Sequence, residues 1–451
     1  MDTMTLRTNL IAARVPRYTS YPTAPHFDDG VTAQTFLGWI SALPPAEPVS
    51  LYFHIPFCDS LCWFCGCHTS VVNAYAPVKA YVDVLLKELD IIAPAGLARR
   101  PVSHIHFGGG SPTILSPDDI DSLAGTIRKR FDVRPNAEIA VEIDPRGLSQ
   151  ETVDAFTRAG VNRASVGVQD INPLVQRTIN RWQPMSVTRE AVSRLRGAGI
   201  TALNIDLMYG LPRQSVCDVR RTVDGAVELA PERVAVFGYA HVPQMKRHQG
   251  LIDSRLLPDA AERLRQYDAV NAALTSYGYI PIGLDHFALA NDPLALAQGS
   301  GKLARNFQGY TTDAALALIG MGTSAISSLP QGYAQNASAT PDYRSNILAG
   351  GLATVRGRTL TENDRLRGTV IERLMCDLEV DLEDVAARHG RTAIEFAGER
   401  RALEALQRDG LVMIEGSRLT VPPHMRAGVR LVAAVFDTYL DQSHARHAVA
   451  V

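Results

Sequence analysis

Residues 50–67 read SLYFHIPFCDSLCWFCGC and join a strand pattern to four closely spaced cysteines. The first six residues, SLYFHI, are mainly apolar and aromatic, which is typical of a buried strand. Cys58, Cys62, Cys65 and Cys67 follow in the next segment. In a parallel sheet, a loop after a strand lies at the carboxyl edge, where α/β enzymes bind their ligands. The segment therefore predicts an α/β fold with a functional loop after its first strand.

Five further segments predict strands, with helical patterns between them. They are HIHF (104–107), AEIAVEI (137–143), RASVGV (163–168), ALNIDLMYG (202–210) and RVAVFGYA (233–240). Residues 78–89 repeat apolar side chains with the period of a helix, and Ser116 followed by Pro117 marks the start of another helix. Strands that alternate with helices pair in parallel through right-handed crossovers, in an open doubly wound sheet or in part of a (β/α) barrel.

The positions of the polar residues and glycines favour the barrel. These residues lie at or just beyond the carboxyl ends of the predicted strands: the cysteines, residues 108–110 (three glycines), Glu142, Gln169, Asp206 and residues 239–241. Barrel enzymes assemble their active sites at that face. We therefore predict an α/β protein built on a partial (β/α)6 barrel related to the TIM barrel.

Two appendages are expected around this barrel. Thr361 and Asp364 form a helix-capping pattern, mainly helical sequence follows, and GLVMIEGSRLTV (410–421) predicts a hairpin that turns at residues 415–416. This pattern is typical of a winged-helix-like module. The predicted division is an N-terminal arm (1–45), a catalytic domain (46–350) and a mainly helical C-terminal domain (351–451).

Composition excludes several functional classes. Lysines and arginines number 45 against 47 acids, so no global positive field attracts nucleic acid or an anionic membrane. No apolar run reaches membrane-spanning length, and the first residues lack the apolar core of a signal peptide. The crowding of four of the six cysteines is unlike a secreted disulfide framework. We therefore expect a cytoplasmic protein that binds neither nucleic acid nor membrane.

The spacing C-x3-C-x2-C of Cys58, Cys62 and Cys65 indicates a metal centre. Ligation by sulfur alone selects zinc or an iron–sulfur cluster, and a structural zinc site usually takes a second pair of ligands that this chain lacks. Three ligands on a [4Fe–4S] cluster leave one iron open. S-adenosylmethionine bound there can accept one electron and release a 5′-deoxyadenosyl radical. Cys217 and Cys376 are interpreted as buried small hydrophobic residues.

Ten more segments, taken with residues 50–67, resemble one enzyme family in order along almost the whole chain. They are PRYTSYPTA (16–24), HFGGGSPT (106–113), VEIDPR (141–146), VGVQD (166–170), NIDLMYGLP (204–212), YAHVP (239–243), GLDHFA (283–288), NFQGYTT (306–312), GMGTSAIS (320–327) and FDTYL (436–440). The chain thus resembles the oxygen-independent coproporphyrinogen III oxidases of the radical S-adenosylmethionine (SAM) superfamily. Cys67 fits the same branch, whereas residues 244–250, QMKRHQG, are atypical of it.

The resemblance implies oxidative decarboxylation of two propionates of coproporphyrinogen III to vinyl groups, which gives protoporphyrinogen IX. It also implies one [4Fe–4S] cluster, two SAM molecules and an electron donor such as a flavodoxin or ferredoxin, in a monomer. Related functions that stay open are a radical SAM tetrapyrrole methyltransferase and a haem chaperone of the same superfamily.

The same resemblance assigns roles to residues. The cluster ligands are Cys58, Cys62 and Cys65. The first SAM falls on Tyr52, Gly109, Glu142, Ala240 and Ile326, and the second on Phe64, Gly110, Ser111, Gln169, Arg181 and Asp206. Because the substrate carries four carboxylates, we also expect Arg17, and Arg305 as a second candidate, to pair with a propionate.

Overall fold

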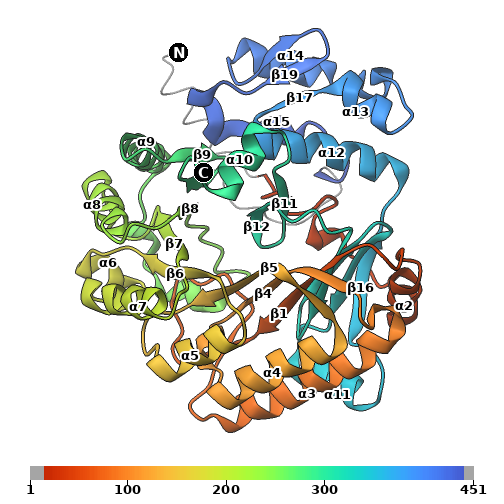
Figure 1. Ribbon diagram of the computed structural model, residues 1–451. Coiled ribbons are helices and arrows are strands. Elements are labelled where there is room, and N and C mark those ends of the chain that lie inside the picture. Colours follow the sequence, from red (N-terminus) through yellow and green to blue (C-terminus); the bar gives the residue numbers. More distant parts are fainter. Residues whose placement is uncertain (1–14, 441–451) are drawn as a thin grey trace.

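A twelve-stranded sheet organises the computed structural model, which describes residues 15–440 (Figure 1). Its strand order is β16-β15-β14-β13-β1-β4-β5-β6-β7-β8-β10-β9. Six of these strands are the predicted ones: β1 (Val49–Ile55), β4 (Pro101–Gly109), β5 (Asp132–Ile143), β6 (Arg163–Gln169), β7 (Ala202–Tyr209) and β8 (Arg233–Gly238). They pair in parallel in chain order. The predicted partial barrel is confirmed.

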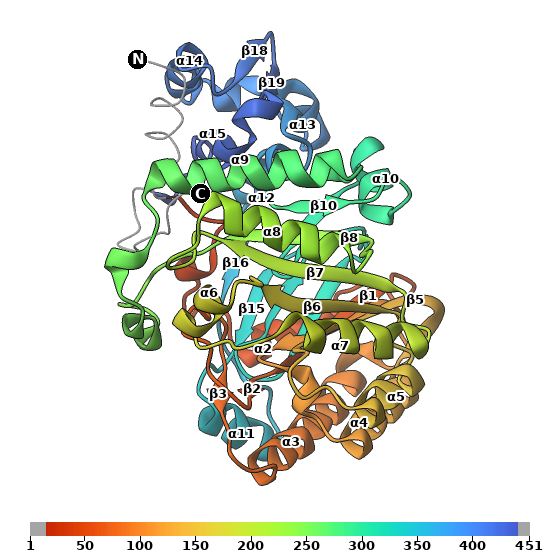
Figure 2. The same cartoon turned by 90° about the vertical axis from the view of Figure 1, so that its left-hand side faces the viewer.

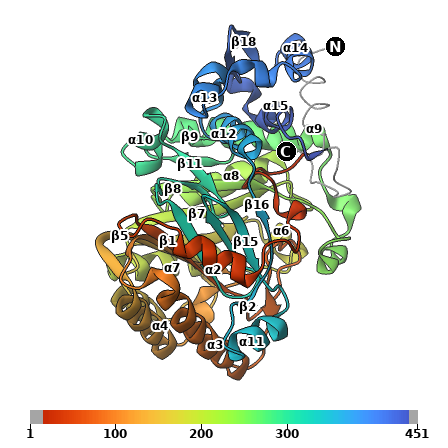
Figure 3. The same cartoon turned by 90° about the vertical axis from the view of Figure 1, so that its right-hand side faces the viewer.

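Shorter strands extend both edges of the parallel sheet. Beside β1 lies β13 (Ala317–Met321), again parallel, and then the antiparallel strands β14 (Ile326–Leu329), β15 (Gly332–Asn336) and β16 (Thr354–Thr359). Beside β8 lie the antiparallel strands β10 (His286–Ala288) and β9 (Ile280–Ile282). Figure 3 shows β15 and β16 on the side of α2 (Ala33–Ser41). The sequence patterns did not predict these edge strands.

Helices cover the outer face of the sheet. They are α3 (Ala76–Ile92), α4 (Pro117–Arg130), α5 (Gln150–Arg158), α7 (Met185–Gly197), α8 (Val216–Val227), α9 (Ala260–Ser276) and α11 (Thr340–Leu348). Figure 2 shows α7, α8 and α9 one above another beside the later strands. Ser116 caps α4 as predicted, because its side chain accepts a hydrogen bond from the backbone of Asp119.

Alternation along each strand separates the core from the site. On β1, Leu51, Phe53 and Ile55 are buried in the main hydrophobic core, whereas Tyr52 and His54 point to the other face. Polar residues of the neighbouring strands line that inner face, among them His106 and Asp206. The concave side of the partial barrel is therefore a polar cavity.

A second hydrophobic core belongs to the C-terminal region. It contains α12 (Glu362–Asp377), α13 (Leu382–Arg388), α14 (Arg400–Arg408), α15 (Val429–Ala434) and a small sheet of β17 (Glu379–Asp381), β19 (Arg418–Thr420) and β18 (Met413–Glu415). Thr361 and Asp364 form the predicted capping box of α12. Gly416, at φ 64°, lies in the predicted hairpin turn. The helical, winged-helix-like character is thus as expected, and the three-part division of the chain stays a prediction.

The N-terminal arm contacts this C-terminal region. Tyr18 donates a hydrogen bond to Asp437 at 3.0 Å, and the hydroxyl groups of Tyr21 and Thr438 lie 3.1 Å apart. Arg430 of α15 donates to the backbone carbonyls of Val15 and Pro16. Residues 1–14 and 441–451 of the predicted arm and C-terminal domain lie outside the described residues.

The remaining helices and strands are short. They are η1 (Ala24–His26), β2 (Phe57–Cys58), β3 (Ser70–Val71), η2 (Ala93–Leu97), η3 (Pro112–Ile114), α6 (Pro173–Thr178), η4 (Arg247–Leu251), η5 (Ser254–Leu256), α10 (Pro293–Gly299), β11 (Ala304–Asn306), β12 (Gly309–Thr311), η6 (Ala393–Phe396) and η7 (Pro423–Gly428). Between residues 15 and 440, no helix has the length and apolar character needed to cross a membrane.

Candidate active site

The cysteine-bearing segment, residues 58–67, follows β1 and lies against the glycine loop after β4. The backbone of Gly110 donates to the carbonyl of Ile55 at 2.8 Å, and that of Ser111 donates to Phe57 at 2.8 Å. A Cβ on Gly110 would come within 2.5 Å of the Phe57 carbonyl oxygen, so only glycine fits there. Gly109 has φ 115° and faces the imidazole of His54. Glycines at these positions let the two loops meet at the barrel mouth.

The three predicted ligands have different surroundings. Cys62 is buried, and Cys58 and Cys65 are half-buried. Burial raises the pKa of the Cys58 thiol to about 11, and this side chain lies 3.2 Å from the hydroxyl of Thr69. A hydrogen bond from Cys67 lowers the pKa of the Cys65 thiol to about 6. The loop thus contains thiols in distinct electrostatic environments.

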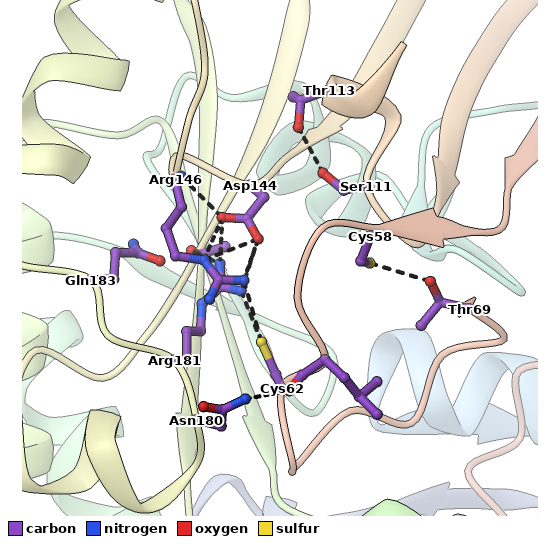
Figure 4. A network of polar contacts seen from close by, with 12 residues as sticks. Cys58, Cys62, Thr69, Ser111, Thr113, Asp144, Arg146, Asn180, Arg181 and Gln183 are labelled. Atoms are coloured by element: carbon purple, nitrogen blue, oxygen red, sulfur yellow. Dashed lines mark hydrogen bonds and ion pairs between the residues drawn. The ribbon is translucent and has the colours of Figure 1, made fainter. Parts of the chain in front are cut away.

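Two arginines meet at Cys62 (Figure 4). Arg146 Nη2 lies 3.5 Å and Arg181 Nη1 3.4 Å from its Sγ atom. Asp144 accepts hydrogen bonds from both arginines, and Arg181 Nη2 also donates to the carbonyl of Gly167 at 2.7 Å. Although burial opposes the charged carboxylate, the positive charges of Arg181 and Arg146 lower the pKa of Asp144. These contacts orient Arg181 at the edge of the cysteine loop.

Residues 246–249, from the segment atypical of the family, hold the same loop from the other side. Lys246 Nζ donates to the carbonyl of Cys67 at 2.9 Å, and His248 Nε2 lies 2.8 Å from the carbonyl oxygen of Cys65. Gln249 Nε2 donates to the carbonyl of Phe64 at 3.0 Å. Three carbonyl groups of the cysteine loop therefore depend on side chains that are about 180 residues away in sequence.

Two predicted cofactor-binding carboxylates line one polar cavity of about 220 Å³. Glu142 accepts from the backbone of Gly109 at 3.1 Å and lies 3.2 Å from His106 Nε2. Asp206 accepts from Ser165 and from Asn204, each at 2.7 Å. Burial raises the pKa of Asp206. Burial would also raise the pKa of Glu142, but the contacts with His106 and Gly109 outweigh this effect, so the pKa of Glu142 is lowered. Both carboxylates are held in fixed orientations.

The other predicted residues lie around this mouth. Tyr52 points from β1 toward His54, whose Nδ1 is 2.9 Å from the tyrosine hydroxyl. Gln169 ends β6 with φ 68°, and Phe64 packs against an apolar cluster that includes Tyr239. Ser111 follows the glycines and its hydroxyl lies 2.6 Å from that of Thr113, Ala240 follows β8, and Ile326 begins β14.

The two predicted substrate arginines line one small cavity that also contains Asp285. Arg17 Nη2 donates to the carbonyl of Gly238 at 3.1 Å, and Arg305 Nη1 donates to Tyr310 at 2.7 Å. Among residues 15–440, Arg305 Nε is buried and has no hydrogen-bond partner. Although burial opposes its charge, contacts with His286, Arg305 and Arg17 hold the pKa of Asp285 at about 2. The structure brings both arginines to one place although 288 positions separate them.

The donor set of the cysteine loop consists of thiols, which iron–sulfur clusters take as ligands. In the described part of the chain, no three Cys, His, Asp or Glu side chains gather closely enough to hold one metal ion. Three thiols on one loop are the ligands that a larger iron–sulfur cluster takes. The cationic side chains of Arg146 and Arg181 beside Cys62 suit the negative charge of thiolates.

Sequence reasoning missed several residues of this site. Asp144 and Arg146 lie just after β5, two and four residues beyond Glu142, so their position after a strand end was an available signal. Residues 246–249 gave no such signal, because they lie at the start of the short helix η4, which is far from the cysteine loop in sequence. Cys217 is exposed on α8, whose buried face is formed by other residues, so its interpretation as buried was wrong, whereas Cys376 is buried as predicted.

Comparisons with known proteins agree with this geometry. The model of the Radical SAM superfamily matches residues 52–226, and that of the HemN C-terminal domain matches residues 360–425. The chain is 48% identical over 438 residues to an oxygen-independent coproporphyrinogen III oxidase of Bradyrhizobium diazoefficiens, with 97% of each chain covered. The corresponding enzyme of Salmonella typhimurium is 41% identical over 428 residues, with 95% of this chain and 93% of the relative covered.

A solved structure is similar over the same length. Coproporphyrinogen III oxidase (HemN) from Escherichia coli, described as a radical SAM enzyme, superposes with a TM-score of 0.90 at 39% identity. The match covers 95% of this chain and 100% of the other. The similarity therefore includes the barrel and the C-terminal region alike.

Proposed function

Because the chain belongs to the oxygen-independent coproporphyrinogen III oxidases of the radical SAM superfamily, we propose that it converts coproporphyrinogen III to protoporphyrinogen IX. The reaction is an oxidative decarboxylation of two propionates to vinyl groups without oxygen. The observation that carries this proposal is the 48% identity over 97% of both chains, which includes the cysteine loop and the C-terminal region. When bound, a [4Fe–4S] cluster with SAM supplies the radical chemistry that removes a substrate hydrogen atom.

Cys58, Cys62 and Cys65 are the proposed cluster ligands. Residues in four strands and one residue after β8 are then proposed to surround the first SAM: Tyr52, Gly109, Glu142, Ile326 and Ala240. The Glu142 carboxylate, which the backbone of Gly109 holds in place, supports this assignment, since SAM offers an ammonium and two ribose hydroxyls as donors. Tyr52 adds an aromatic face next to these polar groups.

The proposed second SAM site is formed by Phe64, Gly110, Ser111, Gln169, Arg181 and Asp206. Asp206 can accept from ribose or ammonium groups, because Ser165 and Asn204 hold its oxygens toward the cavity. Arg181 can meet a carboxylate, although its terminal nitrogens already contact Asp144 and Cys62. This site thus rests on the family resemblance and on the position of these residues at the barrel mouth.

Arg17 and Arg305 are the proposed partners of a substrate propionate. Their guanidinium groups line one cavity near the end of β8, and Arg305 Nε there has no partner within residues 15–440. An Arg17→Ala variant is expected to bind the porphyrinogen about tenfold or more weakly, as for loss of one charge-assisted contact. Unchanged affinity for coproporphyrinogen III, measured under anaerobic conditions, would remove Arg17 from the site.

We also propose a monomer that works in the cytoplasm with an electron donor such as a flavodoxin or ferredoxin. The six cysteines of the chain are free thiols in the structure, which suits a reducing compartment. The proposed division is an arm (1–45), a catalytic domain (46–350) and a C-terminal domain (351–451), and the separate hydrophobic core around α12 and α15 supports a distinct C-terminal part.

One assay tests the proposed activity against the two related functions. Anaerobically reconstituted protein is incubated with coproporphyrinogen III, SAM and a reductant, and carbon dioxide and vinyl products are measured. Two carbon dioxide molecules per divinyl product are expected. Methylated tetrapyrrole would instead indicate a methyltransferase, and haem bound without turnover would indicate a chaperone.

A further inference from the structure

Two guanidinium groups donate hydrogen bonds to the sulfur of Cys62 (Figure 4). Arg146 Nη2 and Arg181 Nη1 lie 3.5 and 3.4 Å from it, within hydrogen-bonding range for sulfur. The Cys62 residue is only 7% exposed. Charges in such surroundings are weakly screened by water. The positive charges of Arg146 and Arg181 therefore have a strong electrostatic effect on a group that is bound through Cys62.

Asp144 fixes the position of both cations. Its Oδ2 atom accepts from Arg146 Nη2 at 2.7 Å and from Arg181 Nη1 at 3.2 Å, and its Oδ1 atom accepts from the backbone of Arg146 at 3.0 Å. The group of three side chains carries two positive charges and one negative charge. The ion pair with Asp144 thus holds the Arg146 guanidinium beside Cys62.

We propose that Asp144, Arg146 and Arg181 form a cationic group that raises the reduction potential of the cluster bound through Cys62. This inference rests on the proposed function, since it requires that cluster. Reduction adds one negative charge to a cluster and its thiolate ligands. Hydrogen bonds to a ligand sulfur and a nearby positive charge stabilise the reduced form more than the oxidised form. Arg146 acts as a positioning and tuning residue, because its contact is with the ligand.

A variant of Arg146 tests the effect on the reduction potential separately from SAM binding. Arg181 is also a proposed contact of the second SAM, so its replacement would change two properties together. Arg146 is assigned to neither SAM molecule, and its guanidinium joins Asp144 to Cys62. Its replacement by Gln removes the charge and keeps a polar side chain of intermediate length.

The test is a redox titration of full-length protein reconstituted anaerobically, followed by electron paramagnetic resonance without SAM. The midpoint potential of Arg146→Gln is expected to be more negative than that of the wild type. A tenfold smaller reduced-to-oxidised ratio at a fixed potential corresponds to about 59 mV for a one-electron couple. Arg158→Gln is the matched control, because Arg158 forms an exposed ion pair with Asp121, and it should keep the wild-type potential.

An Arg146→Gln variant with full iron content and the wild-type potential would overturn the proposal. If that variant does not retain iron, Arg146→Lys keeps the charge as a point charge without the planar fork. A smaller shift in the same negative direction is then expected, and a wild-type potential would overturn the proposal. Failure of the wild type itself to assemble a [4Fe–4S] cluster would refute the proposed function and this inference together. A wild-type cluster with unaltered variants would refute this inference alone.

Discussion

Gln249 offers a direct test of how the cysteine loop is held. Its side chain is 1% exposed and links two backbone groups. The amide nitrogen donates to the carbonyl of Phe64 at 3.0 Å, and the amide oxygen accepts from the backbone of Val242 at 2.6 Å. Gln249→Ala would leave both backbone groups without these partners.

The expected magnitude follows from those two contacts. A buried backbone group that loses its partner costs about 1–3 kcal/mol, so the pair costs roughly 2–6 kcal/mol. Even the lower value corresponds to a roughly 30-fold larger population of the opened loop. Because Phe64 lies between Cys62 and Cys65, an opened loop exposes the bound cluster to competing ligands.

Iron release to a chelator under anaerobic conditions measures this opening. Gln249→Ala is expected to lose iron at least about 30 times faster than the wild type. Gln249→Glu keeps an acceptor for Val242 but no donor for Phe64, so its rate should be intermediate. Arg247→Ala is the control, because Arg247 is exposed in the same segment. Equal release rates for Gln249→Ala and Arg247→Ala would refute the reasoning.

Three further outcomes are expected. Cys67→Ser should retain cluster iron, whereas Cys62→Ser should lose it, as measured by iron content and absorbance; equal loss would indicate four cysteine ligands. Arg181→Ala should still cleave SAM reductively but convert coproporphyrinogen III poorly, so cleavage lost as fully as in Cys58→Ser would refute a separate second site. Burial raises the pKa of Glu88 to about 7, so the folded state binds the extra proton and stability should fall by up to roughly 3 kcal/mol as pH rises from about 4.5 to about 7. Glu88→Gln should flatten this dependence in denaturant melts, and the same pH profile as the wild type would contradict it.

Local patterns predicted the part of the fold that is regular over several residues. Six of the seven parallel strands of the twelve-stranded sheet, β1 and β4–β8, were found from apolar runs, and only β13 was missed. The capping residues Ser116 and Thr361 marked two helix starts correctly. The glycine loop and the acids at strand ends were also located, because parallel strands bring their carboxyl ends to one edge. The comparisons confirm the family resemblance drawn from these segments.

Other features left no local pattern. The strands β9, β10 and β14–β16 have three to six residues each, too few to show a clear period. The contacts of Lys246, His248 and Gln249 run from side chains to distant backbone carbonyls, and any loop can supply a carbonyl. Such contacts depend on how the whole chain folds, and composition near either partner does not reveal them.

The positions of the paired strands in the chain set the order in which the sheet can form during synthesis. β1, which leads into the cysteine loop, pairs with β4 on one side and with β13 on the other. β4 follows β1 closely, whereas β13 begins roughly 260 residues later, which takes about 13–50 s to synthesise at usual rates of translation. During that interval β1 can only be an edge strand, and the cysteine loop that follows it lies beside that edge. Lys246 and Gln249 are synthesised before β13. Their hydrogen bonds to the carbonyls of the cysteine loop can therefore form before β13 joins the sheet as its last parallel strand.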